Sequence, residues 1–201
     1  MENIQNIDAD GNLIVDKLAT ILSNVHVPKK KVIRATIPSH INTIANSAFY
    51  GCTMLKEIII KHDIEIQVHA FFKCTNLTKI NFPKVTSIGA GAFSECTSLT
   101  DIQIPKVTQI EEFTFYNCTN LTDIHIPNVE TIGFYAFHGC SNLNKIKIKN
   151  NIDFISNEAF TGCTNLKNDF KKKLKDFYNF ENNTRIYKTN GGSRKTRKST
   201  K

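Results

Sequence analysis

The chain lacks the features of a secreted or membrane-spanning protein. No run approaches the roughly 18 consecutive apolar residues that a membrane-spanning helix needs. The first 25 residues carry four acidic residues and a single cation, Lys17, so they lack the basic start and the apolar core of a secretory signal. The expected location is therefore intracellular, in the cytoplasm or the nucleus, where a reducing environment keeps cysteines as thiols.

Most of the chain also lacks a net charge, although it contains 26 Lys and Arg residues against 18 Asp and Glu residues. Residues 167–201 hold 12 Lys and Arg against 3 Asp and Glu, which leaves 14 against 15 in residues 1–166. The basic character therefore belongs to the C-terminal segment, where weak polyanion binding is expected. The cations assigned to that binding are Arg194, Lys195, Arg197 and Lys198.

Six cysteines recur at intervals of 22, 22, 22, 22 and 23 residues. They are Cys52, Cys74, Cys96, Cys118, Cys140 and Cys163. Each has a Phe three residues before it, an Ile eight residues before it and a Leu three residues after it. A fixed period of this length indicates a solenoid, in which every repeat forms one coil that stacks on the next.

Each of the first five units has apolar residues at the sixth and eighth places after its cysteine, as Ile102 and Ile104 follow Cys96. This alternation is typical of a half-buried strand, and identical repeats stack such strands in parallel and in register. Proline follows the strand at Pro83, Pro105 and Pro127, where a missing N–H removes no ladder hydrogen bond. The pattern therefore predicts a parallel β-sheet along one face.

Segments such as CTSLTDIQIPKVTQI and IGFYAFHGCSNLNKIKI resemble the BspA-like, Treponema-type leucine-rich repeat. The resemblance covers about Ile37 to Leu166 and implies a leucine-rich-repeat solenoid of about six repeats of 22–23 residues. It also implies a protein-binding role. The inner units have one residue fewer between Pro and Val than the usual repeat. Unlike many bacterial surface members of the family, this chain is not expected to carry a signal peptide.

The two ends of the repeat array are expected to carry helical caps. Apolar residues recur at helical spacing between Asn12 and Val25, and again from Phe170 to Tyr178. The sequence after Thr189 contains no apolar residue, so it is expected to be disordered. The predicted segments are an N-terminal cap at 1–36, the solenoid at 37–167, a C-terminal capping helix region at 168–188 and a disordered basic tail at 189–201.

The cysteine column has two interpretations. Stacked repeats would bring consecutive thiols within disulfide reach, because neighbouring strands lie about 4.8 Å apart. The sequence has no C-x-x-C pair, however, and free cysteine is among the most buried residue types. A reduced and buried structural ladder is therefore predicted. The six histidines share no repeat position, so we expect neither a metal centre nor a cofactor.

The fifth and seventh places after each cysteine should point outward from the predicted sheet. The predicted partner-binding residues there are Lys79, Asp101, Gln103, Asp123, His125 and Lys145. Asp101 and Asp123 should lie roughly 5 Å apart, a separation that retaining glycosidases use. An open sheet offers no pocket to tune those carboxylates, so an enzyme is not expected. The variation at these places is equally explained by the tolerance of exposed positions.

Two functions remain open at this point. The first is a non-catalytic scaffold that binds a protein partner through the solenoid surface, as repeat proteins generally do. The alternative is a polyanion-associated or nuclear protein that acts through its basic tail. A pull-down with and without residues 189–201 would separate them.

Overall fold

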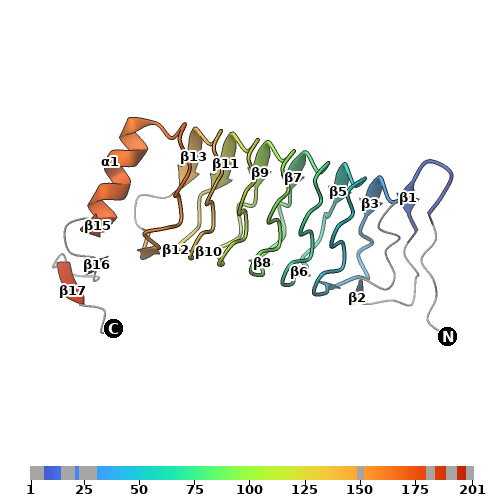
Figure 1. Ribbon diagram of the computed structural model, residues 1–201. Helices are drawn as coiled ribbons and strands as arrows, with labels where there is room; N and C mark the ends of the chain where they lie inside the picture. The colour runs from blue at the N-terminus through green and yellow to red at the C-terminus, as the bar shows by residue number, and fades with distance from the viewer. Residues whose placement is uncertain are drawn as a thin grey trace.

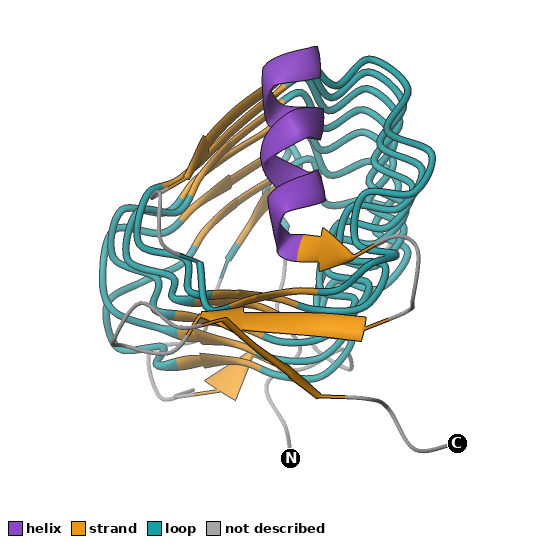
Figure 2. Cartoon of the chain, turned by 90° about the vertical axis from the view of Figure 1, so that its left-hand side faces the viewer, coloured by secondary structure: helices purple, strands orange, loops and turns teal. Residues whose placement is uncertain are grey.

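Successive coils of the chain stack along one axis, from β1 to α1 (Figure 1). The computed structural model describes residues 7–14, 21–22, 31–148, 152–179, 184–188 and 194–197. Viewed along the axis, the coils superpose, and each has two sides that carry strands and a third side made of turns (Figure 2). A single repeat cannot bury its apolar side chains alone, so the coils form one continuous core by stacking.

The first strand-bearing side, which we call the sheet face, carries one strand per coil. Its strands are β1 (Asn12–Leu13), β3 (Arg34–Thr36), β5 (Glu57–Ile59), β7 (Lys79–Asn81), β9 (Asp101–Gln103), β11 (Asp123–Ile126) and β13 (Lys145–Ile148). They pair in parallel, in the orders β1-β3-β5 and β7-β9-β11-β13. Ile102 is aligned with Ile80 and Ile124, so the predicted in-register sheet is confirmed.

The second strand-bearing side consists of two-residue strands. They are β2 (Ile21–Leu22), β4 (Thr43–Ile44), β6 (Glu65–Ile66), β8 (Ser87–Ile88), β10 (Gln109–Ile110), β12 (Thr131–Ile132) and β14 (Phe154–Ile155). They form parallel sheets in the orders β2-β4-β6-β8 and β10-β12-β14. In each of these strands from β4 to β14 the second residue is a buried Ile, which is the residue eight places before the cysteine.

The core is a set of columns that run along the axis. The rings of Phe49, Phe71, Phe93, Phe115 and Phe137 stack one on the next, with centroids 5.0–5.6 Å apart. Stacked aromatic pairs add about 0.5–1.5 kcal/mol each beyond the area they bury. The buried columns of Leu, Ile, Phe and Cys confirm the predicted solenoid.

The N-terminal end differs from the prediction. A helix is expected between Asn12 and Val25, but Asn12–Leu13 form β1 and Ile21–Leu22 form β2. Asn12 pairs with Arg34 and Ile21 pairs with Thr43, and each partner lies 22 residues further along the chain. The helix prediction is therefore wrong at these strands, because a short apolar run cannot distinguish helix from strand and the pairing with the next coil decides.

The C-terminal end carries α1 (Asn168–Phe177), which begins where the repeat would place another strand. The ring of Phe170 meets that of Phe160 edge-on, with centroids 5.5 Å apart, and Leu174 is buried. The helix therefore covers the last coil of the core. None of the helices in the described residues is long and apolar enough to cross a membrane.

Three further strands follow α1 in an antiparallel sheet. They are β15 (Tyr178–Asn179), β16 (Thr184–Lys188) and β17 (Arg194–Arg197), in the order β15-β16-β17. β17 lies inside the segment expected to be disordered, so that expectation is wrong for these four residues. Strand pairing needs backbone groups and no apolar side chain. Asn190 and Gly191, a pair frequent in hairpin turns, stand between the two strands and are the missed signal.

Candidate functional site

The structure places the six predicted binding residues together on the sheet face. Side chains alternate along a strand, so those flanking each buried Ile point away from the core. The first column contains Lys79, Asp101, Asp123 and Lys145, and the second contains Asn81, Gln103, His125 and Lys147. Both columns follow from the parallel register of β7, β9, β11 and β13.

Asp101 and Asp123 lie side by side on neighbouring strands and differ in their partners. Asp123 accepts a hydrogen bond from Thr122 Oγ1 at 2.9 Å, and its other oxygen lies 3.5 Å from Lys145 Nζ. Asp101 accepts a long hydrogen bond of 3.4 Å from Gln103 Nε2. Both side chains are half-buried. Like charges directly opposite each other destabilise a sheet, so this pair is an unfavourable feature of the free protein.

The first column extends further than the sequence analysis predicted. Arg34 on β3 is aligned with Glu57 on β5, and Arg34 Nε lies 3.3 Å from a Glu57 carboxylate oxygen. From Arg34 to Lys145 the charges of this column alternate in sign at every step except between Asp101 and Asp123. Arg34 was missed because its unit has no cysteine before it from which to count.

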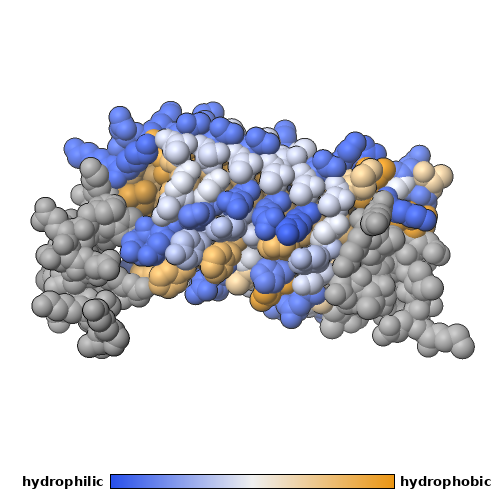
Figure 3. All heavy atoms as spheres, in the orientation of Figure 1, coloured by the Kyte–Doolittle hydropathy of each residue, from blue (hydrophilic) through white to orange (hydrophobic). Residues whose placement is uncertain are grey.

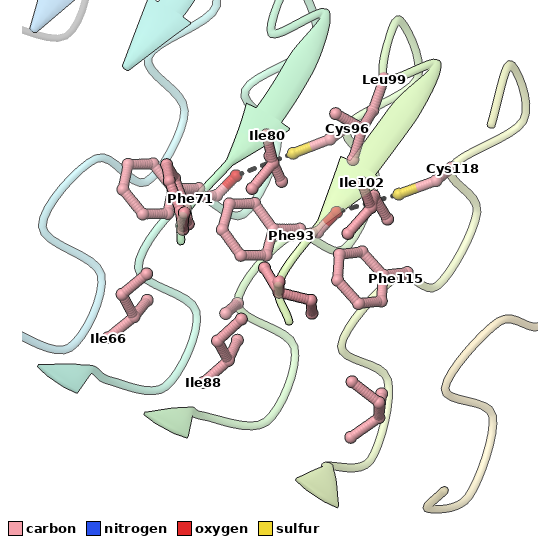
Figure 4. Close-up of a cluster of buried hydrophobic side chains, with 14 of the residues drawn as sticks. Ile66, Phe71, Ile80, Ile88, Phe93, Cys96, Leu99, Ile102, Phe115 and Cys118 are labelled. Atoms are coloured by element: carbon pink, nitrogen blue, oxygen red, sulfur yellow. Dashed lines mark hydrogen bonds between the residues drawn. The ribbon is translucent and has the colours of Figure 1, made fainter. Parts of the chain in front are cut away.

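The cysteines occupy the core, as predicted, and all six are free and buried. From the second member onward, each thiol donates a hydrogen bond of 3.0–3.2 Å to the carbonyl of the core Phe in the preceding coil, as Cys96 does to Phe71 and Cys118 to Phe93 (Figure 4). Burial raises the pKa of Cys74, Cys96, Cys118 and Cys140. A hydrogen bond with Cys140, together with burial, raises that of Cys163. These side chains are therefore protonated packing groups at neutral pH.

The histidines of the described residues lie in separate environments. His62 Nε2 is 2.7 Å from the carbonyl oxygen of Ile41, His69 meets Phe72 edge-on, His138 stacks on Tyr116, and His125 is exposed on the sheet face. Within the ranges that the structure describes, no three His, Cys, Asp or Glu side chains come together in a group that could hold a metal ion.

The predicted polyanion-binding residues can be placed only in part. Arg194, Lys195 and Arg197 belong to β17, and their side chains are outside what the structure describes. Lys198 is also outside the described residues. Polyanion binding by this segment therefore stays a prediction.

The sequence analysis missed a ladder of surface aromatic residues on the side made of turns. Phe113 stacks on Tyr135 at 5.3 Å and Tyr116 stacks on His138 at 5.1 Å, and Phe113 is 40% exposed. The same side appears in Figure 3, where residues of similar hydropathy form rows along the axis and apolar patches are small. The places five and two residues before the cysteine carry this signal in some of the units. We call Phe113, Tyr116, Tyr135 and His138 the turn-face ladder.

The buried columns, the one-strand-per-coil ladder and the 22-residue register define a leucine-rich-repeat solenoid. The sequence matches the family described as BspA type leucine rich repeat region, in six copies, over residues 12–100 and 64–187. The chain belongs to this family.

Two solved bacterial proteins illustrate the likeness. A leucine-rich repeat protein from T. pallidum is 26% identical, with a TM-score of 0.69 over 86% of this chain and 91% of that chain. One from Eubacterium ventriosum is also 26% identical, with a TM-score of 0.61, over 72% of this chain and 46% of that one. A comparison with curated proteins gave no match.

Proposed function

We propose that the chain is a non-catalytic scaffold that binds a protein partner through its sheet face, centred on Asp101 and Asp123. The observation that carries this proposal is the placement of the two carboxylates side by side in the column, between Lys79 and Lys145. Membership of a leucine-rich-repeat family supports an interaction role, because repeat proteins bind through extended surfaces.

The charge order of the column indicates the chemistry of the partner. A cation placed between Asp101 and Asp123 would relieve the repulsion of two adjacent carboxylates. Lys79 and Lys145, which flank the two carboxylates, would then contact acidic groups of the partner. The complementary partner is a basic or mixed-charge surface. Its charges would also steer the encounter at low ionic strength.

The exposure of the carboxylates supports binding over catalysis. A carboxyl group that transfers protons at neutral pH is tuned by burial or by close charges in an enclosed site. Asp101 and Asp123 are half-exposed on an open sheet. The surface is therefore better suited to contact than to proton transfer.

The decisive variant reverses both charges, Asp101→Lys with Asp123→Lys. These side chains point away from the core, so we expect an unchanged circular dichroism spectrum and loss of partner capture in affinity purification. The matched control reverses two exposed acids away from the sheet face, Glu65→Lys with Asp153→Lys, and should bind like the wild type. A chain ending at residue 188 should also bind normally.

The competing surface is the turn-face ladder. If the Asp101/Asp123 variant binds as tightly as the wild type while Phe113→Ala with Tyr135→Ala abolishes capture, the assignment to the sheet face is wrong. If only the chain ending at residue 188 fails to bind, the basic tail carries the function instead.

A further inference from the structure

Among the residues that the structure describes, the last strand of the sheet face has a partner on one edge and none on the other. β13 pairs with β11 and is the end strand of the order β7-β9-β11-β13. Backbone N–H and C=O groups alternate in direction along a strand, so half of those on β13 point away from β11. An edge of this kind can pair with a further strand, and proteins with exposed edges commonly bind extended peptides there.

The apolar side of β13 is incompletely covered. Ile102 and Ile124 on the preceding strands are 0% and 2% exposed, because each has a strand on both sides. Ile146 and Ile148 on β13 are only half-buried. The repeat would place the next strand after Cys163 at residues 168–170, but these residues begin α1. Within the described ranges, no strand therefore completes the burial of Ile146 and Ile148.

A pocket of about 550 Å³ lies between β13 and the start of α1. Its volume falls within the range of about 300–1,000 Å³ that is usual for ligand sites. The pocket has an apolar part formed by Ile146 and Phe170. Figure 1 shows the two elements that enclose it, with α1 following β13 at the end of the solenoid. The pocket therefore borders both the open edge and the incompletely buried apolar row.

The charged residues that line the pocket are mainly of one sign. They are Lys145, Lys147, Lys167, Lys172 and Asp169. Lys145 forms an ion pair with Asp123 on β11. Lys147, Lys167 and Lys172 are exposed. A ligand that fits this lining carries negative charge. It also carries apolar groups, because the pocket continues onto Ile146 and Phe170.

We propose that this pocket binds an extended, acidic segment of a partner protein, which pairs with β13 as an additional strand. Side chains of an added strand alternate between the two faces, as those of β13 do. Apolar residues of the segment would cover Ile146 and Ile148, and acidic residues would lie beside Lys147 and Lys172. The segment therefore has acidic and apolar residues in alternation. This site shares Lys145 with the proposed sheet-face contact but uses neither Asp101 nor Asp123, so the variants that test the two proposals change different residues.

The charge of β13 favours a different protein over a second copy of this chain. Edge-to-edge pairing of two β13 strands would place lysines of one copy beside lysines of the other, and like charges on adjacent strands destabilise a sheet. An acidic segment instead places opposite charges on adjacent strands.

The test is titration of the full chain with a fluorescent peptide of about eight residues that alternates glutamate and valine, a length typical of strands. We expect saturable binding, followed by fluorescence polarisation. Lys147→Glu with Lys172→Glu should weaken it by at least roughly tenfold, which is the effect of losing about 1.4 kcal/mol. The matched control, Lys61→Glu with Lys84→Glu, changes two exposed lysines elsewhere and should bind like the wild type.

Two further peptides separate strand pairing from attraction between charges. A glutamine–valine peptide removes the charge, and a peptide with proline at alternate positions keeps the charge but removes backbone donors. Weak binding of both supports the proposal. Absence of binding by the glutamate–valine peptide, equal binding by the lysine variants, or equal binding by the proline peptide overturns it. Self-association of the chain that is lost in the Lys147/Lys172 variant would also overturn it, because a second copy would then occupy the edge.

Discussion

At the scale of single residues, the cysteine column illustrates what a repeat requires of one position. The side chain must be small enough to fit beside a stacked Phe ring and apolar enough to be buried. It also faces the carbonyl group of the Phe in the preceding coil, to which it donates, as Cys118 does to Phe93 at 3.2 Å. Cysteine meets all three conditions, since its thiol is a weak donor on a small apolar side chain.

The buried thiols predict a loss of stability in alkaline solution. Burial raises the pKa of Cys74, Cys96, Cys118 and Cys140 above the ordinary value of 9.0. Above pH 9 the unfolded chain therefore releases thiol protons that the folded chain keeps, and the equilibrium shifts toward unfolding. The free energy of unfolding should decrease by roughly 1.4 kcal/mol per pH unit for each such thiol. Urea titrations between pH 7 and pH 10 measure it.

The variant that tests this prediction is Cys96→Ala. Its free energy of unfolding should decrease less steeply with pH than that of the wild type, by the contribution of one thiol. A control at pH 8 should show that a thiol-labelling reagent reacts slowly with the folded protein and completely in denaturant. Rapid labelling of all six cysteines in the folded protein, or a stability that does not change from pH 8 to pH 10, would contradict the buried ladder.

At the scale of elements, α1 shows how the array ends. The last coil exposes one side of its apolar columns, and α1 covers Phe160 with Phe170 while burying Leu174. Asp169 lies in the first turn of the helix, where a negative charge interacts favourably with the helix dipole. The same helix does not cover the edge of β13, and the pocket beside that strand results.

The cap predicts a measurable effect of Leu174→Ala. Removal of a buried leucine side chain should lower the free energy of unfolding by about 2–5 kcal/mol. Lys172→Ala, an exposed position on the same helix, should change it by less than about 0.5 kcal/mol. Chemical denaturation followed by circular dichroism compares the two. If Leu174→Ala is as stable as Lys172→Ala, α1 does not contribute to the stability of the last coil.

At the scale of the whole molecule, each coil contacts mainly its two neighbours, so stability is approximately a sum over coils and their interfaces. The sequence Leu-Thr-Asp-Ile occurs at both 99–102 and 121–124. Deletion of residues 101–122 therefore removes one full period and leaves the local sequence at the junction unchanged. Phe93 would then stack on Phe137, and Asp123 would lie beside Lys79.

We expect this deletion to fold, with lower stability and a urea m-value reduced by about a tenth, since less surface is exposed on unfolding. Circular dichroism and urea titration test the expectation. Deletion of residues 101–111 removes half a coil. The apolar residues after the deletion would then be aligned with the turns of the neighbouring coils, so this deletion should abolish folding. If the full-coil deletion is unfolded, or the half-coil deletion is equally stable, the coils are not interchangeable units.

The period determines most of this fold without reference to any distant contact. Once 22 residues form one coil, every position has the same environment in each coil. The sequence therefore predicts the buried Phe, Ile and Cys columns and the outward placement of Asp101 and Asp123. These predictions depend on side-chain alternation and on stacking, which are local to a repeat and its neighbour.

The ends of the array were decided only by the tertiary structure. At the N-terminal end, the apolar run near Ile21 fits a helix as well as a strand, and pairing with Thr43 selects the strand. At the C-terminal end, the half-burial of Ile146 depends on the strand that α1 replaces. Both outcomes depend on whether a neighbour is present on each side of a coil. A periodic sequence pattern cannot supply that information, because it assigns every coil the same surroundings.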